Sequence, residues 1–210
     1  NEKPDLFSAT IWVSLEDIDV STGSLGFIKG SHKFLNNIIG SPSPEIITAT
    51  MGHEALLLSY LTFPPVKKGD ALIFNNKTVH AAFPNKTDKQ RIAAGIGITP
   101  EPAVLYHYHL NPNNPKKIFK LTVDEAFFHT YGNDSLRKCY HKKSMPKYTH
   151  VVDELDYQPV LFSREEIEQE IIRHGNTTNG LPIEQLFANI SFKDKARFAF
   201  QYFMQRIFSK

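Results

Sequence analysis

The sequence has little cysteine, tryptophan or methionine, with one, one and three of these residues. A single cysteine, Cys139, excludes an internal disulfide framework and a Cys-rich zinc module. No apolar run approaches the roughly 18 to 20 residues that a bilayer-crossing helix needs. Lysine and arginine exceed aspartate and glutamate by 24 to 22. That balance lacks the basic excess of a nucleic-acid binder.

The remaining composition is that of a globular protein. The chain has 210 residues and a mass of 23.9 kDa, with 41% hydrophobic and 22% charged residues. This length predicts one domain, or one domain with an appendage. The first residue is Asn1 rather than Met, and no signal-peptide pattern follows it. We therefore expect the natural N-terminus to lie further upstream, and a cytoplasmic location.

Strand patterns fill the first half of the chain. Residues 9–16 alternate, with Ile11, Val13 and Leu15 on one side and polar residues or Trp12 on the other. Several short strands separated by turn residues are typical of a mainly β sandwich or barrel. The predicted strands are 9–16, 25–28, 54–63, 69–74, 79–83, 91–99 and 104–110.

The second half favours loops and helices. A short helix is predicted over 123–131 and irregular structure over 132–162. Ser163-Arg-Glu-Glu166 is a capping box, which predicts a helix to about Gly175. Further helices are predicted over 182–189 and 191–208. We expect a strand core over 1–110, and over 111–210 a loop and helical extension of the same domain.

Two predicted strands carry an unusual face. Arg91 shares one side of its strand with Ala93, Gly95 and Gly97, which leave space for something small. The opposite side is aliphatic, which predicts a packing face. A lone arginine on such a face favours an anion, since its guanidinium fits a carboxylate in bidentate geometry.

The strand before it places His80 beside Ala82 on one side. If these two strands pair, His80 and Arg91 look into one cavity. Trp12 lies with Thr10 and Ser14 on the polar side of its own strand, which resembles a pocket wall. From these residues alone, a packed histidine and a surface arginine remain open alternatives.

Two blocks of sequence resemble the phytanoyl-CoA dioxygenase family. The first is Trp12-Val-Ser-Leu-Glu-Asp-Ile-Asp19 followed by Gly23-Ser-Leu-Gly-Phe-Ile-Lys-Gly-Ser-His32, with Thr22 and Lys29 departing from the family's pattern. The second is Gly69-Asp-Ala-Leu-Ile-Phe74, then His80, Pro84-Asn85 and Arg91. Together the blocks span about residues 9–98.

The resemblance implies a double-stranded β-helix (jelly-roll, cupin-like) fold. It also implies Fe(II) held by two histidines and a carboxylate, with 2-oxoglutarate and dioxygen used to hydroxylate a small-molecule substrate. Imidazole and carboxylate ligands suit Fe(II). In this reading His80 is the distal, catalytic iron ligand, Arg91 binds the far carboxylate of 2-oxoglutarate, and Trp12 lines the co-substrate pocket.

The family's other two iron ligands form a His-x-Asp motif shortly before the tryptophan strand. No His-x-Asp or His-x-Glu occurs in the sequence, so we expect the motif just upstream of Asn1. The alternative is a metal-free relative that binds a carboxylate ligand without catalysis. A third reading is a cupin-like metalloenzyme that uses His107 and His109, although a structural or substrate-contact role is favoured for that pair.

The remaining expectations concern partners. Arg137 to Lys147 is basic and either attracts an anionic substrate, such as a CoA or phosphate ester, or is a solvated loop. We expect no nucleic-acid and no membrane partner. The C-terminal hundred residues are expected to shape the substrate mouth or a homodimer contact. Substrate identity is not readable from the sequence, because specificity loops carry no simple code.

Overall fold

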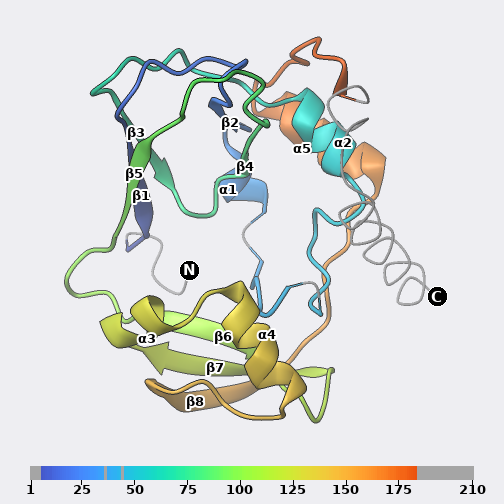
Figure 1. The fold of residues 1–210 in the computed structure, drawn as a ribbon. Helices are drawn as coiled ribbons and strands as arrows, with labels where there is room; N and C mark the ends of the chain where they lie inside the picture. The colour runs from blue at the N-terminus through green and yellow to red at the C-terminus, as the bar shows by residue number, and fades with distance from the viewer. Residues whose placement is uncertain (1–5, 36, 44, 184–210) are drawn as a thin grey trace. The chain divides into compact units, whose positions relative to one another are not determined.

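The computed structural model describes residues 6–35, 37–43 and 45–183, which form eight strands and five helices (Figure 1). The mainly β composition expected from the sequence is confirmed. The chain divides into two compact units that we describe separately. Unit 1 comprises 1–36, 52–103 and 162–195, and unit 2 comprises 37–51, 104–161 and 196–210.

Unit 1 contains a three-stranded antiparallel sheet in the order β3-β1-β5. Its strands are β1 (Ala9–Ser14), β3 (Ala71–Asn75) and β5 (Ala93–Ile98). Trp12 stands opposite Leu72 on one side and Gly95 on the other. Three predicted strands are thereby confirmed, with ends that differ by a few residues.

A second, two-stranded sheet of unit 1 pairs β2 (Leu25–Phe27) with β4 (His80–Ala82), and both strands were predicted. The short helix α1 (Ser31–Phe34) follows β2. The sequence left open whether the His80 strand pairs with the Arg91 strand. It does not, because β4 pairs with β2 and β5 pairs with β1.

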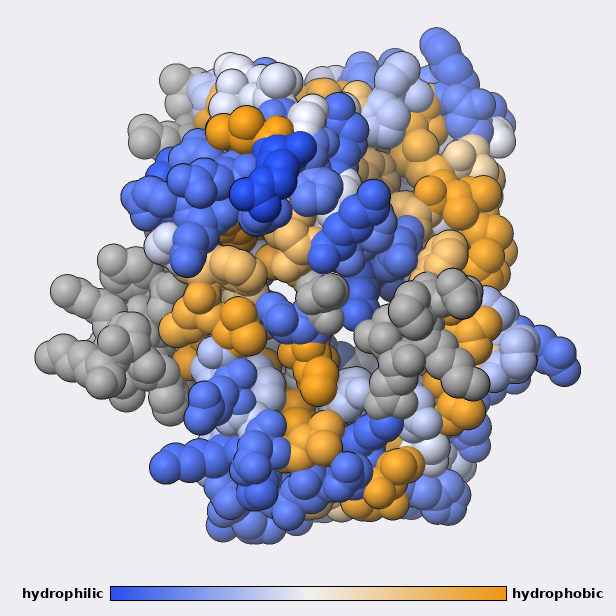
Figure 2. Space-filling view, turned by 180° about the vertical axis from the view of Figure 1, so that it is seen from behind, coloured by the Kyte–Doolittle hydropathy of each residue, from blue (hydrophilic) through white to orange (hydrophobic). Residues whose placement is uncertain are grey.

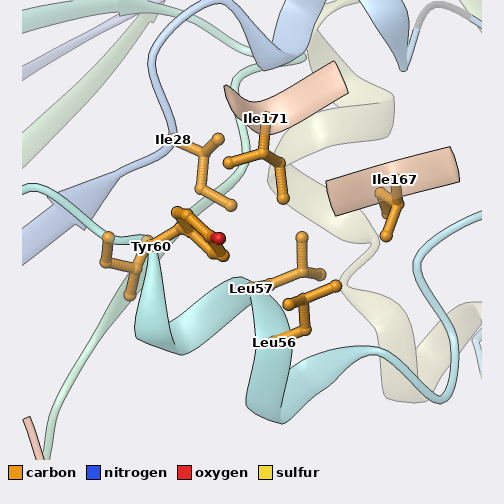
Figure 3. Packing of buried hydrophobic residues seen from close by; sticks show 7 residues of the cluster. Ile28, Leu56, Leu57, Tyr60, Ile167 and Ile171 are labelled. Atoms are coloured by element: carbon orange, nitrogen blue, oxygen red, sulfur yellow. The ribbon is translucent and has the colours of Figure 1, made fainter. Parts of the chain in front are cut away.

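The core of unit 1 lies between α2 (Glu54–Ser59) and α5 (Arg164–Arg173) (Figure 3). The capping box of α5 is confirmed, with the Ser163 hydroxyl accepting from the Glu166 N–H and the Glu166 carboxylate accepting from the Ser163 N–H. Figure 3 shows side chains of the two helices pointing into the space between them, with Ile28 beside Ile171. The buried members are Ile28, Leu56, Leu57, Tyr60, Leu61, Ile167 and Ile171.

The strand predicted over 54–63 is wrong, because residues 54–59 form helix α2. Leucine is a good helix former, and a short apolar run suits a buried helix as well as a strand. The burial of Leu56, Leu57, Tyr60 and Leu61 follows helical spacing. Tyr60 also donates its hydroxyl to the Glu168 carboxylate of α5 at 2.8 Å, which links the two helices.

Unit 2 is built on an antiparallel sheet in the order β6-β7-β8. The strands are β6 (Tyr106–Leu110), β7 (Lys117–Val123) and β8 (Thr149–Asp156). Two helices, α3 (Glu125–Thr130) and α4 (Asn133–His141), connect β7 to β8. A second cluster, Ile46, Leu110 and Ile118, forms the core beside partly buried tyrosines.

The irregular structure predicted over 132–162 is wrong where the chain forms α4 and β8. Strand β7 was not predicted at all. A register shift between Lys120 and Leu121 breaks the period-two pattern in the pairing of β7 and β8. Most of β8 is exposed on both faces, so it carries no clear alternation. The short helix expected over 123–131 is confirmed as α3.

The aliphatic side of the β3-β1-β5 sheet is exposed, which contradicts the packing face expected there. Ile73 is 68% exposed and Ile96 is 55% exposed. Leu15, Ile92 and Ile98 are also exposed, and Figure 2 shows hydrophobic side chains gathered at the surface over these strands. The physical reason is that no other element of the described residues packs on this side of the sheet.

The helices predicted over 182–189 and 191–208 lie almost entirely outside the described residues, which end at residue 183. Among the helices within the described ranges, none is long and apolar enough to cross a membrane.

Candidate functional site

His80 lies at the start of β4, and its side chain is exposed. Its Nδ1 is 2.8 Å from the carbonyl oxygen of Thr78. A carbonyl only accepts hydrogen bonds, so Nδ1 carries the proton and donates. In the neutral ring, this places the lone pair on Nε2, which is the form of imidazole that binds a metal ion.

Two aromatic rings flank His80. The ring centroids of His80 and Phe74 are 4.9 Å apart, and those of His80 and Phe27 are 6.3 Å apart. Phe27 and Phe74 meet each other edge to face at 4.8 Å. Because Phe74 belongs to β3 and His80 to β4, this contact joins the two sheets of unit 1 at the histidine.

Trp12 lies on the same face of the three-stranded sheet as Phe74. It is partly buried, and Gly95 stands opposite it on β5. A Cβ added at Gly95 or Gly97 would meet no atom within 4 Å. The expectation that the small residues of β5 leave open space is therefore confirmed, and Trp12 borders that space.

Arg91 precedes β5, and its Nη1 donates to the carbonyl oxygen of Gly23 at 2.7 Å. Gly23 has φ of 91°, and a Cβ there would lie 2.7 Å from the carbonyl oxygen of Phe83. This turn thus requires glycine. Within the described part of the chain, the other guanidinium N–H groups of Arg91 have no hydrogen-bond partner.

The two aspartates of the first sequence block shape the turn that leads to Gly23. The Asp17 carboxylate accepts from the Lys68 N–H, and the Asp19 carboxylate accepts from the N–H groups of Ser21 and Thr22. Hydrogen bonds from Ser21 and Thr22 hold the pKa of Asp19 below its usual value. These carboxylates therefore stabilise the turn that leads to Gly23, whose carbonyl oxygen accepts the hydrogen bond from Arg91.

Unit 2 contains the second histidine pair. His107 and His109 share one face of β6 with ring centroids 6.0 Å apart. His107 Nε2 lies 2.7 Å from the Ser41 hydroxyl, and the ring packs on Phe127 at 4.7 Å. His109 is fully buried, and neither ring nitrogen has a partner among the described residues. Burial lowers the pKa of each to about 4, with His109 adding to the shift of His107.

No metal centre is complete within the described residues, because they contain no group of three His, Cys, Asp or Glu side chains that could hold an ion. His80 is a single ligand, and His107 and His109 form a pair without a third. The sequence predicted His80, Trp12 and Arg91 as site residues and did not point to Phe27 and Phe74, which contact the His80 ring. Both phenylalanines lie inside the two sequence blocks that resemble the family. Their position in those blocks was the sequence signal that could have identified them.

Comparison with known proteins identifies relatives of the first half of the chain. Residues 4–93 match the family model described as phytanoyl-CoA dioxygenase (PhyH). The zebrafish (Danio rerio) "Phytanoyl-CoA dioxygenase domain-containing protein 1" is 34% identical over 85 residues, which are 39% of this chain and 29% of that protein. The chain thus spans less than a third of that relative's length.

Two solved structures are also similar. The non-heme alpha ketoglutarate dependent epimerase SnoN from nogalamycin biosynthesis has 27% identity and a TM-score of 0.32, over 43% of this chain and 31% of its own. EvdMO1 has 21% identity and a TM-score of 0.36, over 46% of this chain and 20% of its own. Both TM-scores are below 0.5, so the structural likeness carries no argument, and the family match is confined to residues 4–93.

Proposed function

Residues 4–93 match the phytanoyl-CoA dioxygenase family, and from that premise we propose that this chain is part of a non-haem Fe(II)/2-oxoglutarate-dependent dioxygenase. Its substrate is a small molecule, which it hydroxylates with dioxygen. The two sheets of unit 1 are part of a double-stranded β-helix in this proposal. The observation that carries it is the orientation of His80 within the matched segment.

His80 serves as the distal iron ligand. The Thr78 carbonyl fixes the proton on Nδ1, and the side chain is exposed, so Nε2 is free to coordinate a metal. Phe27 and Phe74 limit the rotation of the ring through their contacts. An oriented imidazole loses less entropy on binding a metal ion than a mobile one does.

Arg91 binds the far carboxylate of 2-oxoglutarate. Its Nη1 is anchored on the Gly23 carbonyl, and this contact fixes the guanidinium and leaves its other N–H groups for a carboxylate. A planar guanidinium can hold a carboxylate through two parallel hydrogen bonds. Trp12 and the open space at Gly95 form the wall along which the co-substrate lies.

Iron and 2-oxoglutarate supply the oxidative chemistry when bound. The described residues provide one ligand of the metal centre and do not complete it. We propose that the remaining His-x-Asp ligands lie outside the described residues, just upstream of Asn1, as the family pattern implies. What this chain contributes is an oriented imidazole, a carboxylate-binding cation and an aromatic wall.

The test is an anaerobic titration of the full-length protein with Fe(II) and 2-oxoglutarate, followed by the visible charge-transfer absorption of the complex. The proposal expects a band that disappears in His80→Ala and weakens in Arg91→Ala. A folded full-length protein without any band would overturn the proposal and support a metal-free carboxylate-binding protein.

A further inference from the structure

The loop between α4 and β8 in unit 2, residues 142–148, concentrates positive charge. The sequence from Arg137 to Lys147 contains five lysine or arginine residues and no aspartate or glutamate. Lys142, Lys143 and Lys147 lie in the loop itself, and all three are exposed. This local excess contrasts with the near balance of charge in the whole chain.

Apart from Lys138, the basic residues of this segment divide into two groups. Arg137 Nε and His141 Nε2 contact the same Glu45 oxygen at 3.4 and 2.7 Å. These contacts connect α4 to the 37–51 segment. The three loop lysines form no ion pair with any residue that the structure describes. Their charge is therefore available to an external anion.

Exposed apolar side chains lie close to these lysines in the sequence. Met145 is 38% exposed and Tyr148 is 51% exposed. On the adjoining strand β8, Val151 and Val152 are 57% and 51% exposed. The surface formed by Lys142, Lys143, Met145, Lys147, Tyr148, Val151 and Val152, here called the 142–152 surface, is both cationic and apolar.

The loop is held in place by its own hydrogen bonds. The Ser144 N–H donates to the Cys139 carbonyl at 3.0 Å, and the Lys147 N–H donates to the Tyr131 hydroxyl at 2.8 Å. Pro146 is buried beneath the loop. Met145 and Tyr148 are therefore displayed by an ordered backbone that would need no rearrangement to bind a partner.

We propose that the 142–152 surface docks this protein on an anionic lipid surface. Lysines attract acidic headgroups, while tyrosine, methionine and valine side chains enter the boundary between headgroups and acyl chains. A nucleic acid would use the lysines but leave Met145, Val151 and Val152 without a role. Peripheral docking differs from the sequence-based expectation of no membrane partner, and it is independent of the proposed dioxygenase activity.

The experiment is sedimentation with vesicles of phosphatidylcholine alone or with 30% phosphatidylserine, in low salt. The proposal expects binding to the acidic vesicles only, and a decline as salt is raised. Each lysine near such a surface contributes about fivefold, so Lys142→Gln/Lys143→Gln weakens binding about 25-fold. Met145→Ser/Tyr148→Ser, which keeps every charge, also weakens binding, by about tenfold.

The matched control is Lys67→Gln/Lys68→Gln, an adjacent and exposed lysine pair in unit 1. It removes the same charge and should leave vesicle binding within twofold. Equal loss in this control, or no binding to acidic vesicles, would overturn the proposal. So would tight binding to a DNA duplex that the Met145→Ser/Tyr148→Ser variant retains in full, since that result assigns the surface to soluble polyanions.

Discussion

Two of the histidine-bearing strands of this protein, β4 and β6, illustrate opposite uses of the same residue. On β4 of unit 1, His80 is exposed, and a backbone carbonyl orients its ring. On β6 of unit 2, His109 is fully buried and has no described hydrogen-bond partner. His107 is bound to Ser41 and packs on Phe127.

Under the proposed function, this difference means that spacing alone does not identify a metal site. His107 and His109 have the His-x-His spacing of many metal ligands, but burial disfavours their charged forms and no third ligand is near them among the described residues. His80 has no such motif, yet its ring is oriented for coordination. Two features decide which histidine can bind a metal ion: whether the ring is exposed, and which group the other ring nitrogen hydrogen-bonds.

Removing His80 should have the largest effect on function. His80→Ala in the full-length protein should weaken formation of the Fe(II)/2-oxoglutarate complex more than 100-fold, because a direct ligand is lost. His150→Ala, which removes an exposed histidine from β8, is the matched control and should change it less than twofold. Anaerobic absorption titrations compare the two, and equal behaviour would contradict the role of His80.

Lowering the pH should destabilise unit 2 through the two histidines of β6. The pKa of about 4 for His107 and His109 lies below the ordinary value of 6.5, so the unfolded state binds protons more readily. The free energy of unfolding of unit 2 should therefore fall by about 3 kcal/mol per histidine as the pH drops from 6.5 to 4. Hydrogen exchange of β6 amides, corrected for intrinsic rates, measures this loss.

His109→Phe should remove one histidine's share of that pH dependence, since phenylalanine is a neutral ring. His150→Ala again serves as the control and should keep the full slope. If the β6 amides of the wild-type protein stay fully protected from hydrogen exchange at pH 4.5, the histidine pair of β6 does not govern acid stability.

The Gly23 turn that anchors Arg91 offers a smaller perturbation. Gly23→Ala should destabilise unit 1 by about 2 to 3 kcal/mol, because φ is 91° and the new Cβ would lie 2.7 Å from the Phe83 carbonyl oxygen. Gly69→Ala has almost the same φ, 90°, but open space around its Cβ, so it should cost only about 1 kcal/mol. Denaturant unfolding checks both, and equal costs would mean that the close approach at Gly23 is relieved.

The smallest effect is expected at Arg91 itself. Arg91→Lys should weaken 2-oxoglutarate binding about tenfold, because an ammonium cannot reproduce the bidentate fork, while stability changes little at this exposed position. Equilibrium titration with 2-oxoglutarate measures the change. An unchanged affinity in a folded variant would place the carboxylate elsewhere.

Much of unit 1 was predictable because its strands follow simple rules. The alternation in β1 and the turn residues before β3 mark these strands, and the capping box marks α5. Helix α2 was mistaken for a strand because Ala-Leu-Leu-Leu has no period that separates the two structures. In unit 2, the register shift within β7 and the exposure of β8 removed the alternation that prediction needs.

The candidate site was predictable only in part. His80, Arg91 and Trp12 were found from small-residue faces and from the family resemblance. The contact of His80 with Phe74 was not, because it joins strands of two different sheets, and no local pattern reports such a pairing. The aliphatic side of β5 was expected to be packed, since a sequence shows that a face is apolar but not what covers it.

The most direct test of the proposed metal site is to observe which histidines lie close to the bound metal ion. Paramagnetic broadening of imidazole NMR signals can be followed as Mn(II) and 2-oxoglutarate are added to the full-length protein. We expect the His80 signals to broaden first while those of His107 and His109 stay sharp. Broadening of His107 and His109 with His80 unaffected would contradict this expectation and move the metal centre to β6.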